Sequence, residues 1–252
     1  MHKENCFLTL TYDTKNLPKY GNLIPNHFIK FIKKLKKHYS IKPKHSKRIY
    51  PKIRYFHCGE YGELGNRPHY HAILFGFDFP DKIPFRNENG NQLYVSPTLE
   101  EKWGHGFATI GAVTFESAAY VARYILKKVW GREAHNYYST VDEETGEVID
   151  LQPEYASMSR RPGIAKAWYE KFSGDVFPKD FVVIRGREMV TPKYYEKLLE
   201  KADPLLHEFI KLEREVSQQQ NRKENTPERL AQRLENLEHN LLRTKRKYEY
   251  GT

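Results

Sequence analysis

The chain has 252 residues, with 42 Lys and Arg against 32 Asp and Glu, and 14% of its residues are aromatic. This length predicts one large domain or one domain with an appendage, and the basic balance favours a polyanionic partner, although it also serves solubility. Two cysteines without paired spacing argue against a disulfide framework or a zinc ribbon. No segment resembles a membrane span or a signal peptide, so we expect a soluble, intracellular protein.

The first 76 residues predict three strands and one amphipathic helix. Residues 6–12 alternate in the manner of a half-buried strand. After Pro25, Asn26 is the predicted cap of a helix whose apolar positions are separated by lysines. A second basic run, residues 42–54, leads into a strand over residues 55–61. That strand turns through residues 62–68 into RPHYHAILFG, residues 67–76, whose apolar end indicates a buried strand.

Two histidines on this last strand are candidate metal ligands. His69 and His71 share one face, because alternate side chains of a strand point the same way. The hairpin brings Glu60 back beside them, although Glu63 and Asp13 are alternative sources of a carboxylate. Two imidazoles and a carboxylate leave positions open for water and a substrate oxygen, a donor set that favours Mg²⁺ or Mn²⁺ over structural zinc. Taken alone, the H-x-H spacing is more often two unrelated histidines.

The middle of the chain is predicted to alternate between loops and short elements. Residues 77–91 are polar and read as a surface loop, and a short helix follows from Ser96 to Trp103. A strand is predicted within residues 104–114. Residues 131–153, beyond the next helix, are predicted to form a loop with a turn at residues 144–146.

The helix predicted over residues 115–129, capped by Thr114, carries two tyrosines four residues apart. Tyr120, Tyr124 and Lys127 fall on one stripe, because residues three and four apart are neighbours on a helix. The stripe lies roughly opposite the predicted apolar face, which consists of Ala118, Val121, Ala122, Ile125 and Val129. For this helix alone, half-buried packing tyrosines are an equally simple interpretation.

The last third of the chain is basic and then helical. Arg160 and Arg161 are candidate phosphate contacts before a helix that contains Trp168, which we assign to the core. A hairpin is predicted over residues 181–190, followed by helices over residues 192–215 and 227–247. We therefore predict a catalytic domain of residues 1–190 and a helical, charged extension of residues 191–252. The extension could pack on the domain, bind a partner or self-associate.

A tyrosine beside a divalent cation has a defined chemistry with a phosphodiester. Attack by the phenol forms a 5′-phosphotyrosine and frees a 3′-OH, and a nearby lysine can stabilise the developing charge. The phosphotyrosine keeps the energy of the broken linkage, so the step is reversible and can rejoin strands. A second tyrosine one helical turn away can attack a second strand while the first is loaded.

The segments GEYG, RPHYHAILFG and AAYVARYILKK, with CFLTLTYD near the N-terminus, resemble the HUH endonucleases. The likeness is to the two-tyrosine replication initiators of gokushovirus-type microviruses. It implies an α+β fold, in which helices pack against one face of a central antiparallel sheet related to the RNA-recognition fold. The residue roles that it implies are metal binding by His69, His71 and Glu60, nucleophilic attack by Tyr120 and Tyr124, and assistance by Lys127 or Lys128.

The activity that the resemblance implies is rolling-circle initiation in the cytoplasm of a bacterial host. The origin of the viral DNA is nicked, a host polymerase extends the 3′-OH, and the displaced circle is cut and joined. Single-stranded DNA and origin DNA are the expected partners, and a host helicase is expected because the chain has no G-x-x-x-x-G-K-[ST] loop. The alternatives are an HUH transposase or relaxase, a non-catalytic single-stranded nucleic-acid-binding protein and, last, a packaging protein.

Overall fold

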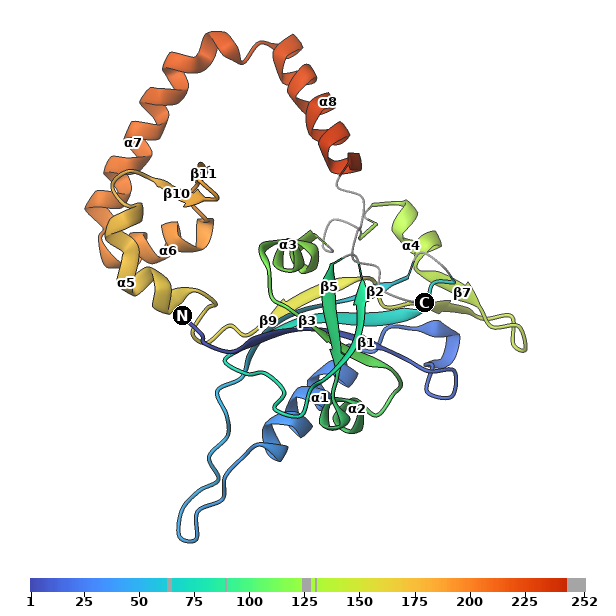
Figure 1. Cartoon of the computed structure of the whole chain (residues 1–252). Helices are drawn as coiled ribbons and strands as arrows, with labels where there is room; N and C mark the ends of the chain where they lie inside the picture. The colour runs from blue at the N-terminus through green and yellow to red at the C-terminus, as the bar shows by residue number, and fades with distance from the viewer. Residues whose placement is uncertain (63–64, 89, 124–127, 130, 244–252) are drawn as a thin grey trace. The chain divides into compact units, whose positions relative to one another are not determined.

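The computed structural model describes residues 1–62, 65–88, 90–123, 128–129 and 131–243 (Figure 1). The chain divides into two compact units, the first from His2 to Arg161 and the second from Pro162 onward. This division lies before the domain boundary predicted at residue 190. The reason is that residues 162–190 form elements that share a small core with the helices that follow them.

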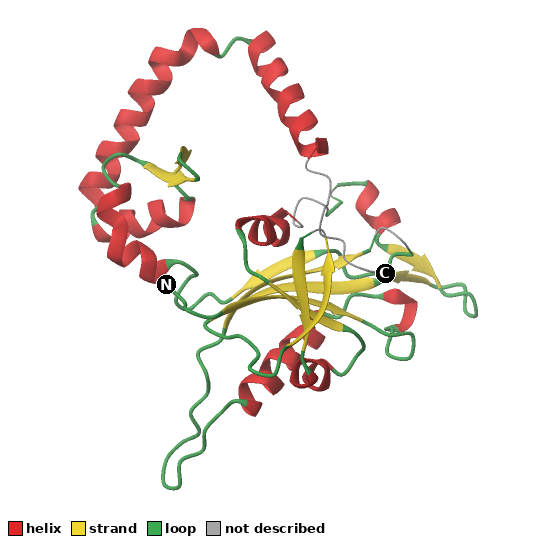
Figure 2. Cartoon of the chain, viewed as in Figure 1, coloured by secondary structure: helices red, strands yellow, loops and turns green. Residues whose placement is uncertain are grey.

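An antiparallel sheet of seven strands is the centre of the first unit, as expected (Figures 1 and 2). Strand β1 is central and pairs with β3 on one side and with β6 on the other. The strand order is β4-β5-β6-β1-β3-β2-β9. The strands are β1 (Asn5–Thr11), β2 (Arg54–Tyr61), β3 (Pro68–Phe75), β4 (Ile83–Glu88), β5 (Asn91–Val95), β6 (Ala108–Gly111) and β9 (Tyr155–Met158).

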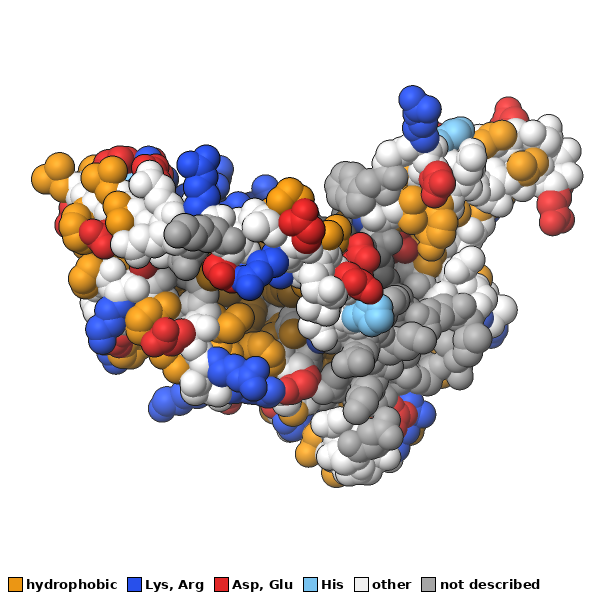
Figure 3. All heavy atoms as spheres, turned by 90° about the horizontal axis from the view of Figure 1, so that it is seen from above, with side chains coloured by type: hydrophobic (Ala, Val, Ile, Leu, Met, Phe, Trp, Pro, Cys, Tyr) orange, Lys and Arg blue, Asp and Glu red, His pale blue; other side chains and the backbone are white. Residues whose placement is uncertain are grey.

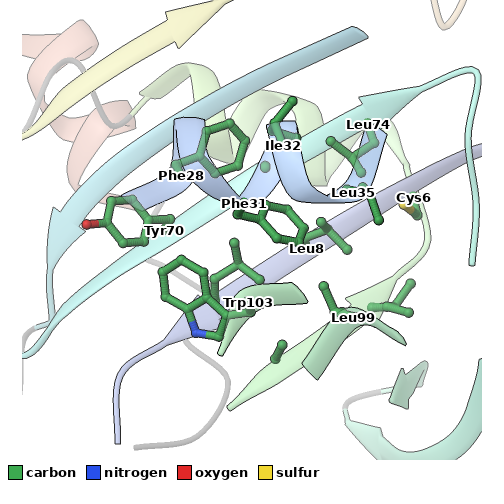
Figure 4. Packing of buried hydrophobic residues seen from close by; sticks show 14 of the residues in the cluster. Cys6, Leu8, Phe28, Phe31, Ile32, Leu35, Tyr70, Leu74, Leu99 and Trp103 are labelled. Atoms are coloured by element: carbon green, nitrogen blue, oxygen red, sulfur yellow. The ribbon is translucent and has the colours of Figure 1, made fainter. Parts of the chain in front are cut away.

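Helices α1 (Pro25–His38) and α2 (Pro97–Trp103) cover one face of this sheet and bury the main hydrophobic core. Figure 4 shows the apolar side of α1 directed at Leu8, Tyr70 and Leu74 of the sheet. Each such buried side chain contributes about 1.5–3 kcal/mol relative to its exposed state. The predicted Asn26 cap is wrong, because Pro25 takes the first helical position and Ile24 precedes it.

Helix α3 (Phe115–Arg123) lies on the opposite face, over β2 and β3, so helices cover both faces rather than one. Its start is the predicted one. The Ser117 amide donates to Thr114 Oγ1 at 3.2 Å, and the Thr114 amide donates to Ser117 Oγ at 2.8 Å. These reciprocal bonds satisfy amides that the first turn of a helix leaves without partners.

Two segments predicted as loops contain regular structure. Strands β4 and β5 lie within residues 77–95, and Phe77 and Phe79 before them are buried in the core. Every residue of β4 but the last is exposed, so no apolar alternation marks it. Helix α4 (Glu133–Tyr137) and the hairpin of β7 (Ser139–Val141) and β8 (Val148–Asp150) occupy the second segment. Strands of three residues are too short to show a period, although the turn at residues 144–146 is correct.

The second unit is helical around one hairpin. Its elements are η3 (Asn221–Glu224), α5 (Lys166–Val176), β10 (Phe181–Ile184), β11 (Arg187–Val190), α6 (Lys193–Ala202), α7 (Pro204–Gln220) and α8 (Pro227–Arg243). The hairpin is as predicted, whereas the helix predicted over residues 192–215 breaks at Asp203. The proline that follows disfavours helical geometry at Asp203, whose Oδ1 accepts the Leu206 amide at 3.0 Å. Trp168 stacks on Tyr195 beside this core. None of the described helices is long and apolar enough to cross a membrane.

Candidate metal centre and nucleophile

The hairpin of β2 and β3 brings Glu60, His69 and His71 together, as the sequence predicts. In its register Glu60 is opposite His69, and Cys58 is opposite His71. The Nε2 atoms of His69 and His71 lie 2.6 and 2.9 Å from the same oxygen, Glu60 Oε1. One ligand atom from each residue falls within 4.8 Å of the others. We call these three residues the triad.

The two alternative carboxylates are not part of the triad. Asp13 Oδ1 accepts the Asn16 amide at 2.8 Å in an exposed turn after β1, and Glu63 lies outside the described residues. Glu60 is 1% exposed, so its carboxylate is enclosed by the protein. The hairpin alone therefore supplies the triad.

Hydrogen bonds at the far side of each imidazole orient the two histidines. His69 Nδ1 donates to the Arg67 carbonyl oxygen at 3.0 Å. Because a carbonyl only accepts, this bond places the proton on Nδ1 and directs Nε2 at Glu60. His71 Nδ1 is hydrogen bonded to Thr9 Oγ1 at 3.1 Å. Such outer contacts set the tautomer and orientation of metal-binding histidines.

The electrostatics of the triad favour a bound cation. Burial raises the pKa of Glu60, but its hydrogen bonds and charge interactions with the two histidines outweigh burial and hold that pKa well below its usual range. Glu60 is therefore an ionised carboxylate in a buried place, which is costly without a compensating positive charge. Adjacent ligands of octahedral Mg²⁺ are about 3 Å apart, close to the separations of the two Nε2 atoms from Oε1. The donor set therefore fits a divalent ion.

Tyr120 brings a phenol to the triad from α3. Its hydroxyl lies 3.4 Å from His71 Nε2, and the two rings meet edge to face with centroids 4.9 Å apart. The helix face predicted from apolar residues is therefore wrong in part. Tyr120 is buried with Ser117 and Val121, whereas Ala122 is exposed. The reason is that α3 packs on the histidine side of the sheet, where Tyr120 contacts an imidazole.

The other predicted site residues are placed less fully. Tyr124 and Lys127 lie outside the described residues, and Lys128 follows them as a partly exposed side chain. Arg160 and Arg161 are exposed just after β9, which pairs with β2, the strand of Glu60.

The sequence analysis missed Thr9 and Phe7, which support His71 from β1. Phe7 stacks on the His71 ring with a centroid distance of 5.5 Å, and Thr9 is its register partner. The alternation of CFLTLT places both side chains on one face, but their neighbour is set by pairing between strands that are far apart in the chain.

Comparison with known families follows this geometry. The family of replication-associated proteins of the ORF2 type matches residues 5–129, the part of the chain that contains the triad and Tyr120. The chain belongs to this family. Its antiparallel sheet and the two histidines on β3 are thus features of a replication-associated protein.

Three phage proteins are similar to this replication-associated chain. Replication-associated protein VP4 of Bdellovibrio phage phiMH2K is 35% identical over 81% of the chain and 60% of its own length. Replication-associated protein ORF2 of Spiroplasma virus 4 is 31% identical over 84% of the chain and 64% of its own length. Replication-associated protein ORF4 of Chlamydia phage 1 is 31% identical over 50% of the chain and 31% of its own length. The chain thus spans less than two thirds of these relatives, and no solved structure matches it significantly.

Proposed function

We propose that this replication-associated protein is a metal-dependent, site-specific endonuclease and strand transferase for single-stranded DNA that starts rolling-circle replication of a phage genome. The observation that carries the proposal is the position of the Tyr120 hydroxyl, 3.4 Å from His71 of the triad. A nucleophile and a metal site need this proximity, because a phosphate must contact both at once. The similar phage proteins, which are named for replication, support the biological setting.

The proposed reaction is a transesterification. Tyr120 Oη forms a bond to the phosphorus of a DNA phosphodiester, and the bond from phosphorus to the 3′ oxygen breaks. The phenol gives up its proton to solvent, and the departing 3′ oxygen takes a proton. A divalent cation, Mg²⁺ or Mn²⁺, held by the triad would withdraw charge from the phosphate and orient it. The products are a 5′-phosphotyrosine and a free 3′-OH, so the number of high-energy linkages does not change.

The rest of the cycle is assigned by the same proposal. Tyr124, the second nucleophile, attacks a second strand while Tyr120 is loaded, and Lys127 stabilises the developing charge. Arg160, Arg161 and Lys128 hold the strand by its phosphates. A host helicase separates the strands and a host polymerase extends the 3′-OH in the infected bacterial cell. The residue 1–190 segment is the catalytic part in this scheme, with residues 191–252 as its extension.

The test is formation of a covalent adduct. Labelled single-stranded oligonucleotides that tile the phage genome are incubated with the purified protein in Mn²⁺ or in EDTA. The products are then separated on a denaturing gel. We expect a Mn²⁺-dependent adduct that peptide mass spectrometry places on Tyr120 or Tyr124. Tyr120→Phe with Tyr124→Phe should remove it, whereas Tyr137→Phe, at an exposed tyrosine of α4, should leave it unchanged. Binding of the origin strand without any adduct would contradict the proposal and favour a non-catalytic binding protein.

A further inference from the structure

Positive charge is concentrated in one stretch of the chain. Between Thr14 and Gly59 lie 13 of the 42 Lys and Arg residues and none of the 32 Asp and Glu residues. The rest of the chain has 29 basic against 32 acidic side chains, so this stretch accounts for the whole net charge of +10. Charge segregated in this way produces a local field that attracts a polyanion.

Two adjoining elements present this charge to solvent. The basic helix face is the exposed side of α1 and consists of Lys30, Lys33, Lys34 and Lys37. The basic arm is residues 40–52, which leave the end of α1, fold back at a bridge between Ile41 and Ile49, and return to β2 (Figures 1 and 2). Its exposed basic residues are Lys42, Lys44, Lys47, Arg48 and Lys52. Within the described part of the chain, no ion pair involves a Lys or Arg between residues 30 and 52.

The basic elements belong to the side of the sheet opposite the triad. Tyr70 of β3 is buried in the core beneath α1, and its neighbours His69 and His71 point to the other face. Figure 3 views the protein from above, and the face that it displays has Lys and Arg interspersed with Asp and Glu. A strand bound at the triad would therefore leave the basic helix face and the basic arm accessible.

The form of these elements fits duplex DNA better than a single strand. Lys30 and Lys37 stand about 10 Å apart along a rigid helix, and a duplex presents about one phosphate charge per 1.7 Å of its axis. A two-stranded arm is also an element that the major groove, about 12 Å wide, admits. Surfaces for single strands stack bases on several aromatic rings. Among the Phe and Tyr residues between positions 26 and 52, Tyr50 alone is exposed.

The arm is poorly suited to a protein partner that adds a strand. Pro43 and Pro51 lie within it, and lysines occupy both of its sides. Proline and lysine on an edge strand are the residues that oppose pairing with a further chain. The exposed basic groups are therefore better explained by contact with phosphates.

We propose that the basic helix face and the basic arm form a second DNA-binding surface, which holds duplex DNA while a single strand occupies the triad on the other face of the sheet. The inference rests on the proposed function for the identity of the nucleic acid as DNA. In that setting, one protein molecule keeps the unopened duplex close to the strand that it cuts.

The test measures duplex and single-strand affinity separately. Fluorescence anisotropy is recorded with a labelled duplex of about 20 bp, long enough for the 6–10 phosphate contacts of an ordinary site, and with one of its strands. The buffer contains EDTA and 50 to 200 mM NaCl. The arm variant is K42S/K44S/K47S/R48S. The control is K171S/K193S/K197S/K201S, which removes four lysines of the second unit and gives the same net charge.

We expect the arm variant to lose duplex affinity and salt dependence, whereas the control binds as the parent protein does. Each lost phosphate contact lowers the slope of log affinity against log salt by about 0.9. If all four contacts are lost, the parent protein should lose about 100-fold more affinity than the arm variant between 50 and 200 mM salt. Single-strand affinity should change by less than about twofold, since those contacts are assigned to the other face.

Three results would overturn the inference: no duplex binding by the parent protein, equal duplex binding by arm variant and control, or an equal loss of single-strand affinity in the arm variant. The same preparations are assayed for Mn²⁺-dependent adducts with the origin strand, and we expect the arm variant to form them. If no preparation forms an adduct, the proposed function fails, but the comparison of duplex affinities still decides the role of the arm.

Discussion

His57 offers a quantitative test of how the first unit is packed. Its ring is 1% exposed on the α1 side of the sheet and stacks on Phe28, with centroids 3.7 Å apart and planes at 11°. Neither ring nitrogen has a hydrogen-bond partner among the described residues. Burial lowers the pKa of His57 from 6.5 to about 3. Replacement by phenylalanine keeps an aromatic ring of similar shape and removes both polar atoms.

The pKa difference fixes the sign and size of the effect. The unfolded chain binds a proton at His57 below pH 6.5, whereas the folded chain stays neutral there until about pH 3. The stability that depends on neutral His57 is therefore complete above pH 6.5 and is lost as the pH falls toward 3. The loss is about 1.4 kcal/mol per pH unit, or about 2 kcal/mol at pH 5. A phenylalanine has no such loss.

The assay is urea unfolding of the parent protein and His57→Phe at pH 7.5 and pH 5. At pH 7.5 we expect the variant to be more stable by about 1–3 kcal/mol, because no buried polar atom is left without a partner. This advantage should grow by about 2 kcal/mol at pH 5. His45→Phe, at an exposed position of the basic arm, should show no such growth. A difference between His57→Phe and the parent that stays constant with pH would refute the reasoning.

Two further predictions concern the triad and a tight turn. Thr9→Val removes the hydrogen bond to His71 Nδ1 and should weaken Mn²⁺ binding in calorimetry by about 10–100-fold; Thr140→Val, on a separate hairpin, is the control, and equal affinities would contradict the role of Thr9. Gly106→Ala should lower the free energy of unfolding by about 3 kcal/mol or more, because φ is +143° and a Cβ would lie 2.2 Å from the Asp13 backbone nitrogen. Gly174→Ala, which has open space around its Cβ, should be nearly neutral in urea unfolding, and a similar loss in both variants would argue against the close contact.

Local patterns explain why the triad could be predicted from the sequence. A turn with glycine and proline fixes the pairing of β2 with β3, and the two-residue period of a strand then places His69 and His71 on one face with Glu60. The same locality explains the prediction of α1 and the 181–190 hairpin. In each case the residues that decide the structure are neighbours in the chain.

The failures arise where tertiary contacts decide. The face of α3 is set by the imidazole on β3 that it packs against, so an apolar count misplaces Tyr120. Strand β4 is almost wholly exposed and forms by pairing with β5, without a hydrophobic period of its own. The support of His71 by Thr9 depends on a strand far away in sequence. Residues 162–190 join the helices after them through packing that composition does not reveal.

The origin of the site in two separate parts of the chain has a consequence for its opening. The triad belongs to a single hairpin whose members span only residues 60–71, whereas Tyr120 reaches it from a helix 49 residues further along the chain than His71. Local opening of α3 would withdraw the phenol and leave the three ligands in register, since no hairpin bond depends on that helix. Ion affinity and cutting competence can thus vary independently, and a protein with α3 displaced would hold an ion and a phosphate without breaking the strand.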